Sequence, residues 1–192
     1  MSDMVRMRVL ISNDDGIGAP GIERLEHIVA EITDDVWVVA PESDNSGAGH
    51  SLTLSQPVRV RQLSERRFAV NGTPTDSVLM GVLELISDRR PDLVLSGINR
   101  GGNLGEDITY SGTVAAAMEG TLLGIPSIAL SQHSDNVHRT RWSTAERHAP
   151  DLLRALVEIG WPANVFLNVN FPNVPADQVK GVSVTRQGRR KP

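Results

Sequence analysis

Short apolar runs alternate along this chain with segments in which apolar residues recur every three or four positions. A continuous run of Val, Ile and Leu is typical of a strand covered on both faces, and the longer period is typical of an amphipathic helix. Parallel strands need crossover connections, so the alternation predicts an α/β fold with a largely parallel sheet. The predicted strands are residues 8–12, 36–40, 92–96, 127–131, 165–170 and 182–185.

Four helices are predicted between these strands. The first begins near Pro20, which suits an early helical position, and the second is one that Thr75 or Asp76 would cap. A third ends before Gly124, and in the fourth Pro150 would kink or restart the helix. Their apolar positions fall within residues 22–32, 78–86, 114–122 and 143–159.

One part of the chain departs from the alternation. Residues 57–63 and 67–70 have the pattern of a short, half-exposed antiparallel ribbon, which we expect to flank the main sheet. The 192 residues show no internal repeat or low-complexity tract. We therefore predict a single domain over residues 1–192.

Composition excludes several classes of function. The net charge is −4 and aromatic residues make up 4% of the chain, so neither a basic field nor stacking platforms for a nucleic acid polymer are expected. There are no cysteines, which excludes disulfides and thiolate chemistry. No apolar stretch approaches the roughly 20 residues that span a bilayer. These features predict a cytoplasmic protein without membrane contact.

The adjacent acids Asp14 and Asp15 directly follow the first predicted strand. Two neighbouring carboxylates at the end of a buried strand repel each other unless something positive binds there, and Mg²⁺ or Mn²⁺ would suit their oxygens. The alternative is an acidic turn, because Asp, Asn and Gly are also turn residues. Seen alone, the pair leaves both interpretations open.

Loops after two further strands supply partners for these acids. Residues 41–50 follow the second strand and include Ser46, and residues 97–105 follow the third and include Asn99. Ligands in open α/β sheets bind outside the carboxyl ends of the strands. Asp14, Asp15, Ser46 and Asn99 are therefore the predicted metal ligands, with Glu42 and Asp44 as nearby acids that sequence cannot rank.

A phosphate site is predicted beside the metal. The glycine-rich loop with Gly101, Gly102 and Asn103 exposes backbone N–H groups, and Ser111, Gly112 and Thr113 lead into the third helix. The competing interpretation of Ser111 is a plain N-cap. His50 could touch a substrate, and a polar loop over residues 132–141 could form a lid or remain solvated. Walker A, dinucleotide and Gly-x-Ser-x-Gly motifs are absent.

Together these motifs resemble the SurE family of survival-protein nucleotidases. The shared sequences include Ile-Ser-Asn-Asp-Asp-Gly at 11–16, Ser-Gly-Ile-Asn-Arg-Gly-Gly-Asn-Leu-Gly at 96–105 and Tyr-Ser-Gly-Thr-Val-Ala-Ala-Ala-Met-Glu-Gly at 110–120. Further matches lie at residues 19–22, 39–41, 46–47, 51–54, 71–76, 167–172 and 184–188. The resemblance spans nearly the whole chain, and several such motifs in one order are specific.

The resemblance implies a three-layer α/β/α Rossmann-like fold and a metal-dependent phosphomonoesterase. Its substrates would be nucleoside monophosphates, cleaved at the 5′ and also the 3′ position, with exopolyphosphatase activity besides. It implies one divalent cation per subunit on Asp14, Asp15, Ser46 and Asn99, and a homodimer or tetramer. Family proteins run well past the Thr-Arg-Gln-Gly motif at 185–188, so the chain is expected to lack their C-terminal extension.

Our functional hypothesis is hydrolysis of a nucleoside monophosphate. Asp14, Asp15 and Asn99 are the predicted catalytic residues. The predicted substrate-binding residues are Asn13, Gly101, Gly102, Asn103, Ser111, Gly112 and Thr113. The alternatives are a non-catalytic nucleotide-binding or regulatory protein on the same scaffold, and a metal-dependent glycan or ester hydrolase.

Overall fold

A seven-stranded sheet forms the centre of the computed structural model, which describes residues 7–134 and 140–189. The strand order is β3-β4-β2-β1-β5-β6-β7, and all pairings are parallel except that of β3 with β4. The strands are β1 (Val9–Ser12), β2 (Val36–Pro41), β3 (Arg59–Ser64), β4 (Arg67–Asn71), β5 (Leu93–Arg100), β6 (Ser127–Gln132) and β7 (Leu167–Phe171).

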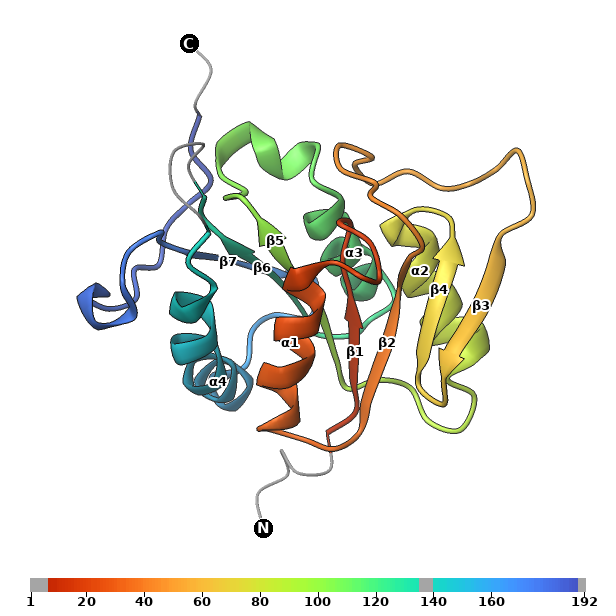
Figure 1. Cartoon of the computed structure of the whole chain (residues 1–192), viewed down its shortest axis with the longest axis horizontal. Coiled ribbons are helices and arrows are strands. Elements are labelled where there is room, and N and C mark those ends of the chain that lie inside the picture. The colour runs from red at the N-terminus through yellow and green to blue at the C-terminus, as the bar shows by residue number, and fades with distance from the viewer. Residues whose placement is uncertain (1–6, 135–139, 190–192) are drawn as a thin grey trace.

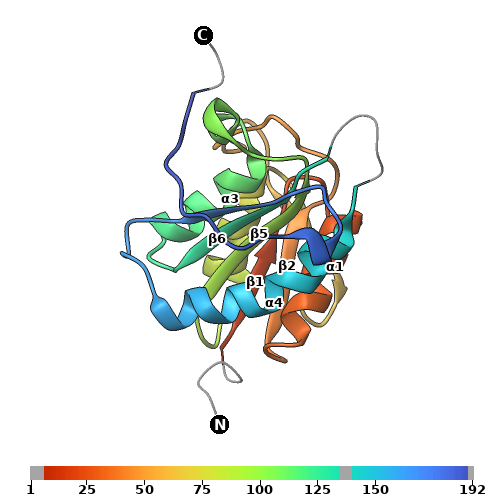
Figure 2. The ribbon, with the colours of Figure 1, turned by 90° about the vertical axis from the view of Figure 1, so that its left-hand side faces the viewer.

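Helices cover both faces of the sheet (Figure 1). The α-helices are α1 (Pro20–Ala30), α2 (Pro74–Met80), α3 (Gly112–Leu122) and α4 (Trp142–Ile159), and the other helical segments are the π-helix η2 (Gly81–Leu85) and the 3₁₀ segments η3 (Gly105–Thr109) and η4 (Ala176–Gln178). Helices α1 and α4 lie together on one face, as the turned view shows (Figure 2), and α2 and α3 pack on the other. The predicted three-layer α/β fold is confirmed.

Two apolar clusters join the layers, and the strands alternate between them. Val9 and Ile11 of β1 pack with α1 and α4, whereas Leu10 packs with the helices of the other face. Every residue of β1 and β6 is buried, as their continuous apolar runs predict for strands covered on both sides. No described helix has the length and apolarity to cross a membrane.

The predicted antiparallel ribbon is confirmed as β3 and β4 at one edge of the sheet, where β4 also pairs in parallel with β2. The strand predicted over residues 182–185 is wrong. That segment has no strand assignment, and Val184 is 97% exposed. A β-branched run forms a strand only against a partner that takes up its backbone hydrogen bonds, and no described strand lies beside this one.

Two expectations about the helices need correction. The N-cap of α2 is Thr73, not Thr75 or Asp76, and Asp76 instead completes a capping box by accepting from the Thr73 N–H. Helix α4 continues through Pro150 as one helix, so the proline does not restart it. Helix α1 begins at Pro20, as predicted.

The topology places one strand end at a junction. The chain leaves β1 for β2 on one side and later returns to β5 on the other, so β1 lies at the switch point of the strand order. Connections from β1 and its two neighbours diverge there and leave room for a ligand. Residues 13–16, which follow β1, occupy this position.

We expect Gly21→Ala to destabilise the fold, because α1 crosses the end of β5 at that residue. A Cβ at Gly21 would lie 1.9 Å from the Ile98 carbonyl oxygen, and this backbone atom cannot turn away. Overpacking of this kind costs about 1–3 kcal/mol or more. Gly18→Ala is the matched control, since a Cβ there meets nothing within 4 Å. Urea unfolding of both variants measures the difference, and equal midpoints would contradict this packing.

Candidate active site at the switch point

Asp14 lies where β1, its following loop and the start of α3 meet. Its residue exposure is only 4%, and the Thr113 hydroxyl donates to its Oδ1. The helix can approach this closely because residue 112 is glycine: a Cβ at Gly112 would lie 2.6 Å from the Asp14 Cβ. The carboxylate therefore lies at the N-terminus of a helix, where the helix dipole favours negative charge.

Burial dominates the electrostatics of the acid pair. It raises the pKa of Asp14 above its usual value, against the opposing effect of hydrogen bonds from the Thr113 side chain and backbone. Burial together with the charge of Asp14 raises the pKa of Asp15 to about 6, although the Arg100 backbone hydrogen bond opposes this. Both carboxylates are thus held in a place that disfavours their charged forms in the absence of a cation.

The end of β5 meets the pair through Asp15, because the strand extends to Arg100 and includes Asn99, which the sequence placed in the following loop. The Arg100 backbone that bonds to Asp15 directly follows Asn99, the predicted amide ligand, at the end of β5. The Asn99 side-chain N–H group donates to the Gly101 carbonyl over 2.9 Å. Because this bond uses the Nδ2 atom of the amide, the Oδ1 atom of Asn99 remains as the candidate cation ligand.

The loop after β2 is attached to the pair from the other side. The Asn45 N–H donates to the Asp14 backbone carbonyl over 2.7 Å. Ser46 bonds through its N–H to Asp44 over 2.8 Å, and its side chain also lowers the pKa of Asp44. Asp44 acts electrostatically on both Asp14 and Asp15, whereas Glu42 forms an ion pair with Arg61. Of the two nearby acids, Asp44 is the one beside the site.

The residues present suit a hard divalent cation. The carboxylates of Asp14 and Asp15 would be accompanied by neutral oxygens from Ser46 and Asn99, which is a donor set that Mg²⁺ and Mn²⁺ accept. The buried Oδ1 of Asn13 has no hydrogen-bond partner in the described structure, and its Nδ2 donates to Gly16. Within residues 7–134 and 140–189, no group of three or more His, Cys, Asp or Glu side chains forms a metal cluster.

The predicted phosphate loop has fewer free donors than the sequence suggests. The Gly101 N–H donates to the Gln132 carbonyl, and the Asn103 N–H donates to the Asn170 side chain, both over 2.9 Å. Of the three loop residues, Gly102 alone has no backbone N–H hydrogen bond within the described part of the chain. The Gly102 N–H is therefore the backbone group of this loop that can donate a hydrogen bond to a phosphate.

At the start of α3, the structure places two hydroxyls in roles that the sequence left open. Ser111 is the N-cap, and its Oγ accepts from the Val114 N–H over 3.1 Å. The hydroxyl can still donate its own proton to a ligand. The Thr113 hydroxyl already donates to Asp14, so it holds the carboxylate in place.

The histidines have specific neighbours. His50 lies 2.7 Å from Glu119 of α3, measured between Nε2 and Oε2. His133 follows β6 and borders the glycine loop, because a Cβ at Gly102 would lie 3.1 Å from its Nδ1. Residues 135–139 of the predicted lid or solvated loop lie outside the described residues.

Sequence reasoning missed the side chains that support the loop from β7. Asn168 and Asn170 both bond to the backbone of Asn103. The available signal was two amides at alternate positions of a predicted strand, which places both on the same face of the sheet.

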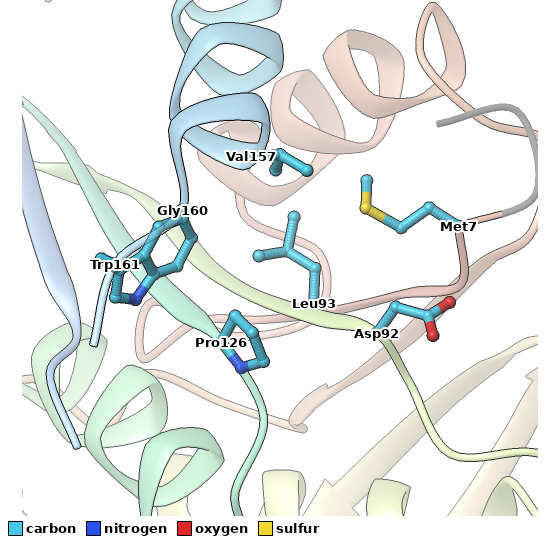
Figure 3. Close-up of a pocket in the computed structure, with 7 residues that line it drawn as sticks. All are labelled: Met7, Asp92, Leu93, Pro126, Val157, Gly160 and Trp161. Carbon is cyan, nitrogen blue, oxygen red and sulfur yellow. The ribbon is translucent and has the colours of Figure 1, made fainter. Parts of the chain in front are cut away.

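An apolar pocket lies elsewhere. Leu93, Val157 and Trp161 contribute to it at the amino ends of the strands, away from the acid pair (Figure 3). A polar pocket lies at the carboxyl edge instead, where Ser43 and Asn45 face Asn71 and Thr73. Only the second pocket adjoins the loop that carries Ser46.

The fold and the switch-point acids define an α/β protein of the Rossmann-like class. The sequence profile of the family described as survival protein SurE matches residues 9–192. A Paramagnetospirillum magneticum protein named 5′-nucleotidase SurE is 61% identical over 191 residues, covering 100% of this chain and 74% of its own length. A Brucella anthropi protein of the same name is 59% identical over 186 residues, covering 95% and 72%.

A solved structure agrees with these relatives. The crystal structure of the SurE protein from Aquifex aeolicus superposes with a TM-score of 0.88 at 44% identity, covering 95% of this chain and 73% of that one. The chain belongs to the SurE family.

We expect Thr113→Val to raise the pKa of Asp14 further. The substitution keeps the side-chain shape but removes the hydroxyl donor that favours the charged carboxylate. Thr113→Ser retains the donor and should leave the pKa near that of the wild type. Carboxyl carbon chemical shifts followed by NMR in EDTA measure both. A pKa that does not differ between the two variants would contradict the hydrogen bond.

Proposed function

We propose that this chain is a 5′-nucleotidase: a metal-dependent phosphomonoesterase that converts a nucleoside monophosphate and water into a nucleoside and phosphate. The observation that carries the proposal is the pair of the buried Asp14 and the half-buried Asp15, both with raised pKa values, at the switch point and beside the start of α3. The names of the relatives, 5′-nucleotidase SurE, support the same activity. We extend it to 3′-nucleotides and short polyphosphate, because recognition centred on a phosphate tolerates variation in the rest of the substrate.

One divalent cation per subunit, Mg²⁺ or Mn²⁺, would be held by Asp14, Asp15, Ser46 and Asn99. When bound, it would neutralise phosphoryl charge and make a nearby water more acidic. Asp14 is fixed by Thr113 and by the N–H of Asn45, which donates to its carbonyl, so its carboxylate enters the reaction already oriented. Preorganisation of this kind spares the reaction the cost of arranging charges.

The protein would bind the phosphate from two directions. The Gly102 N–H and the Ser111 hydroxyl can donate to phosphate oxygens, and the N-terminus of α3 favours the negative charge. Gly101, Asn103, Gly112 and Thr113 shape this cradle and hold its donors in place, and Asn13 supports the turn after β1.

Hydrolysis needs a water in line with the leaving ribose oxygen. The water oxygen bonds to phosphorus as the phosphorus–ribose bond breaks, and a water proton leaves while the ribose oxygen gains one. Asp14, Asp15 and Asn99 are the groups of this chain that would orient that water. We favour direct attack by water over a covalent aspartyl-phosphate, since the Asp14 carboxylate is already committed to Thr113.

The assembly and location that we propose follow the family resemblance. The protein would act as a homodimer, with a tetramer as the larger assembly, in the cytoplasm. Light scattering coupled to gel filtration measures the assembly directly. A monomer that hydrolyses AMP would show that the site is complete within one chain.

Asp14→Asn should abolish most phosphate release from AMP and GMP while leaving the fold intact. The substitution removes one unit of ligand charge but preserves the shape of the side chain. We expect a loss of about a hundredfold or more, as for the removal of other electrostatic groups in active sites. Glu42→Gln is the control, because Glu42 pairs with Arg61 and not with the acid pair. Near-normal rates for Asp14→Asn would disprove the assignment.

Cation removal separates the enzyme from its rivals. Phosphate release from AMP should stop in EDTA and return with Mn²⁺. A non-catalytic nucleotide-binding protein would bind AMP without releasing phosphate under either condition. A glycan or ester hydrolase would release none and would cleave its own substrate instead.

A divalent cation should also stabilise the folded protein, because it would relieve the repulsion between the adjacent carboxylates of Asp14 and Asp15. At a Mn²⁺ concentration of 100 times the dissociation constant, the stabilisation is about 2.7 kcal/mol. Thermal melting with Mn²⁺ and with EDTA measures it, and Asp15→Asn should reduce the shift. An identical melting temperature in EDTA and in saturating Mn²⁺ would contradict binding at this site.

A further inference from the structure

Two asparagines of the edge strand β7 hold the glycine loop by its backbone. The Asn170 Oδ1 accepts from the Asn103 N–H over 2.9 Å, and its Nδ2 donates to the Asn103 carbonyl over 3.2 Å. The Asn168 Nδ2 donates to the same carbonyl over 2.9 Å. The backbone of one loop residue is thus bonded on both its N–H and its C=O side.

The geometry of a strand makes this arrangement possible. Side chains two residues apart point to the same face, so Asn168 and Asn170 reach the loop together. A carboxamide carries both donor and acceptor atoms, so Asn170 can satisfy a peptide group much as a neighbouring strand would. The hydroxyl of Ser131 on β6 accepts a hydrogen bond from the Asn103 side-chain N–H over 2.9 Å. A second strand therefore also holds Asn103 in place.

Asn103 lies next to Gly102, the loop residue whose backbone N–H is the candidate phosphate donor. Gly102 precedes Asn103 and keeps its backbone N–H free within the described structure. Gly101 is bonded through its carbonyl to Asn99, one of the candidate cation ligands. A shift of Asn103 would therefore move a candidate phosphate donor and disturb the support of a candidate ligand.

We infer that Asn168 and Asn170 are positioning residues for phosphate binding: they fix Asn103 so that the Gly102 N–H remains available to a phosphate oxygen. The inference rests on the proposed function, since it assigns the phosphate to this loop. Neither asparagine needs to touch the substrate. The plain alternative is that both amides only attach β7 to the rest of the fold, in which case their loss would lower stability without changing phosphate affinity.

The test compares three alanine variants of the full chain in saturating Mn²⁺. Calorimetry gives the dissociation constant of inorganic phosphate, steady-state kinetics give KM and kcat for AMP, and thermal melting reports on the fold. We expect Asn170→Ala to raise the phosphate dissociation constant and KM about tenfold, which corresponds to the loss of the one hydrogen bond between the Gly102 N–H and the phosphate. Asn168→Ala should have a smaller effect, because the Asn103 N–H keeps its acceptor.

Asn173→Ala is the matched control, because the Asn173 side chain accepts from the Arg141 N–H, away from the glycine loop. It should change neither the dissociation constant nor KM. A lower melting temperature for Asn170→Ala with phosphate affinity and KM unchanged would overturn the inference in favour of a purely structural role. If Asn170→Ala does not fold, Asn168→Ala decides: weaker phosphate binding supports positioning, and unchanged binding rejects it.

The phosphate measurement also separates this inference from the proposed function. A wild-type protein that binds phosphate but releases none from AMP would refute the nucleotidase proposal. The three dissociation constants would still decide the role of the asparagines.

Discussion

The contact between Asp14 and the start of α3 determines the arrangement of the whole carboxyl edge. The Thr113 hydroxyl and the absence of a side chain at Gly112 bring the helix onto the carboxylate. The loop after β2 then bonds to the Asp14 backbone through Asn45, and the end of β5 reaches Asp15 through the Arg100 backbone. Segments distant in sequence are thus placed around one buried acid, and each of them carries a candidate residue for binding the cation or the phosphate.

Much of this could be predicted from the sequence, because parallel strands bring their following loops to one edge. Asp14 and Ser46 follow β1 and β2, and Asn99 lies at the end of β5, so their common location needs only the order of these three neighbouring strands. The roles of individual hydroxyls and N–H groups could not be predicted in the same way. Thr113 faces Asp14 because the start of α3 packs closely against that residue, and the Asn103 N–H already donates to Asn170.

The wrong strand and the missed asparagines share a physical cause, which is that a local pattern does not reveal its partner. Residues 182–185 have the same β-branched character as true strands, but no strand of the described structure lies beside them. In Asn168 and Asn170 the pattern suggests only a polar strand face, whereas the structure shows the amides bonding to a loop from β5. The cap of α2 differs, since Thr73 and Asp76 show the capping-box spacing in the sequence itself.

Buried charge is balanced by ion pairs at the amino ends of the strands, whereas the acid pair at their carboxyl ends has no such partner in the described structure. At the amino edge, the buried Arg8 forms ion pairs with Asp35 and Asp88, and its hydrogen bond to Asp88 lowers the pKa of that acid to about 2. At the carboxyl edge, Asp14 and Asp15 form no ion pair among the described residues, and their pKa values are raised. Folding alone would favour neutralising both edges, because an unpaired buried charge is costly. The edge left negative is the one that a cation and a phosphate would complete.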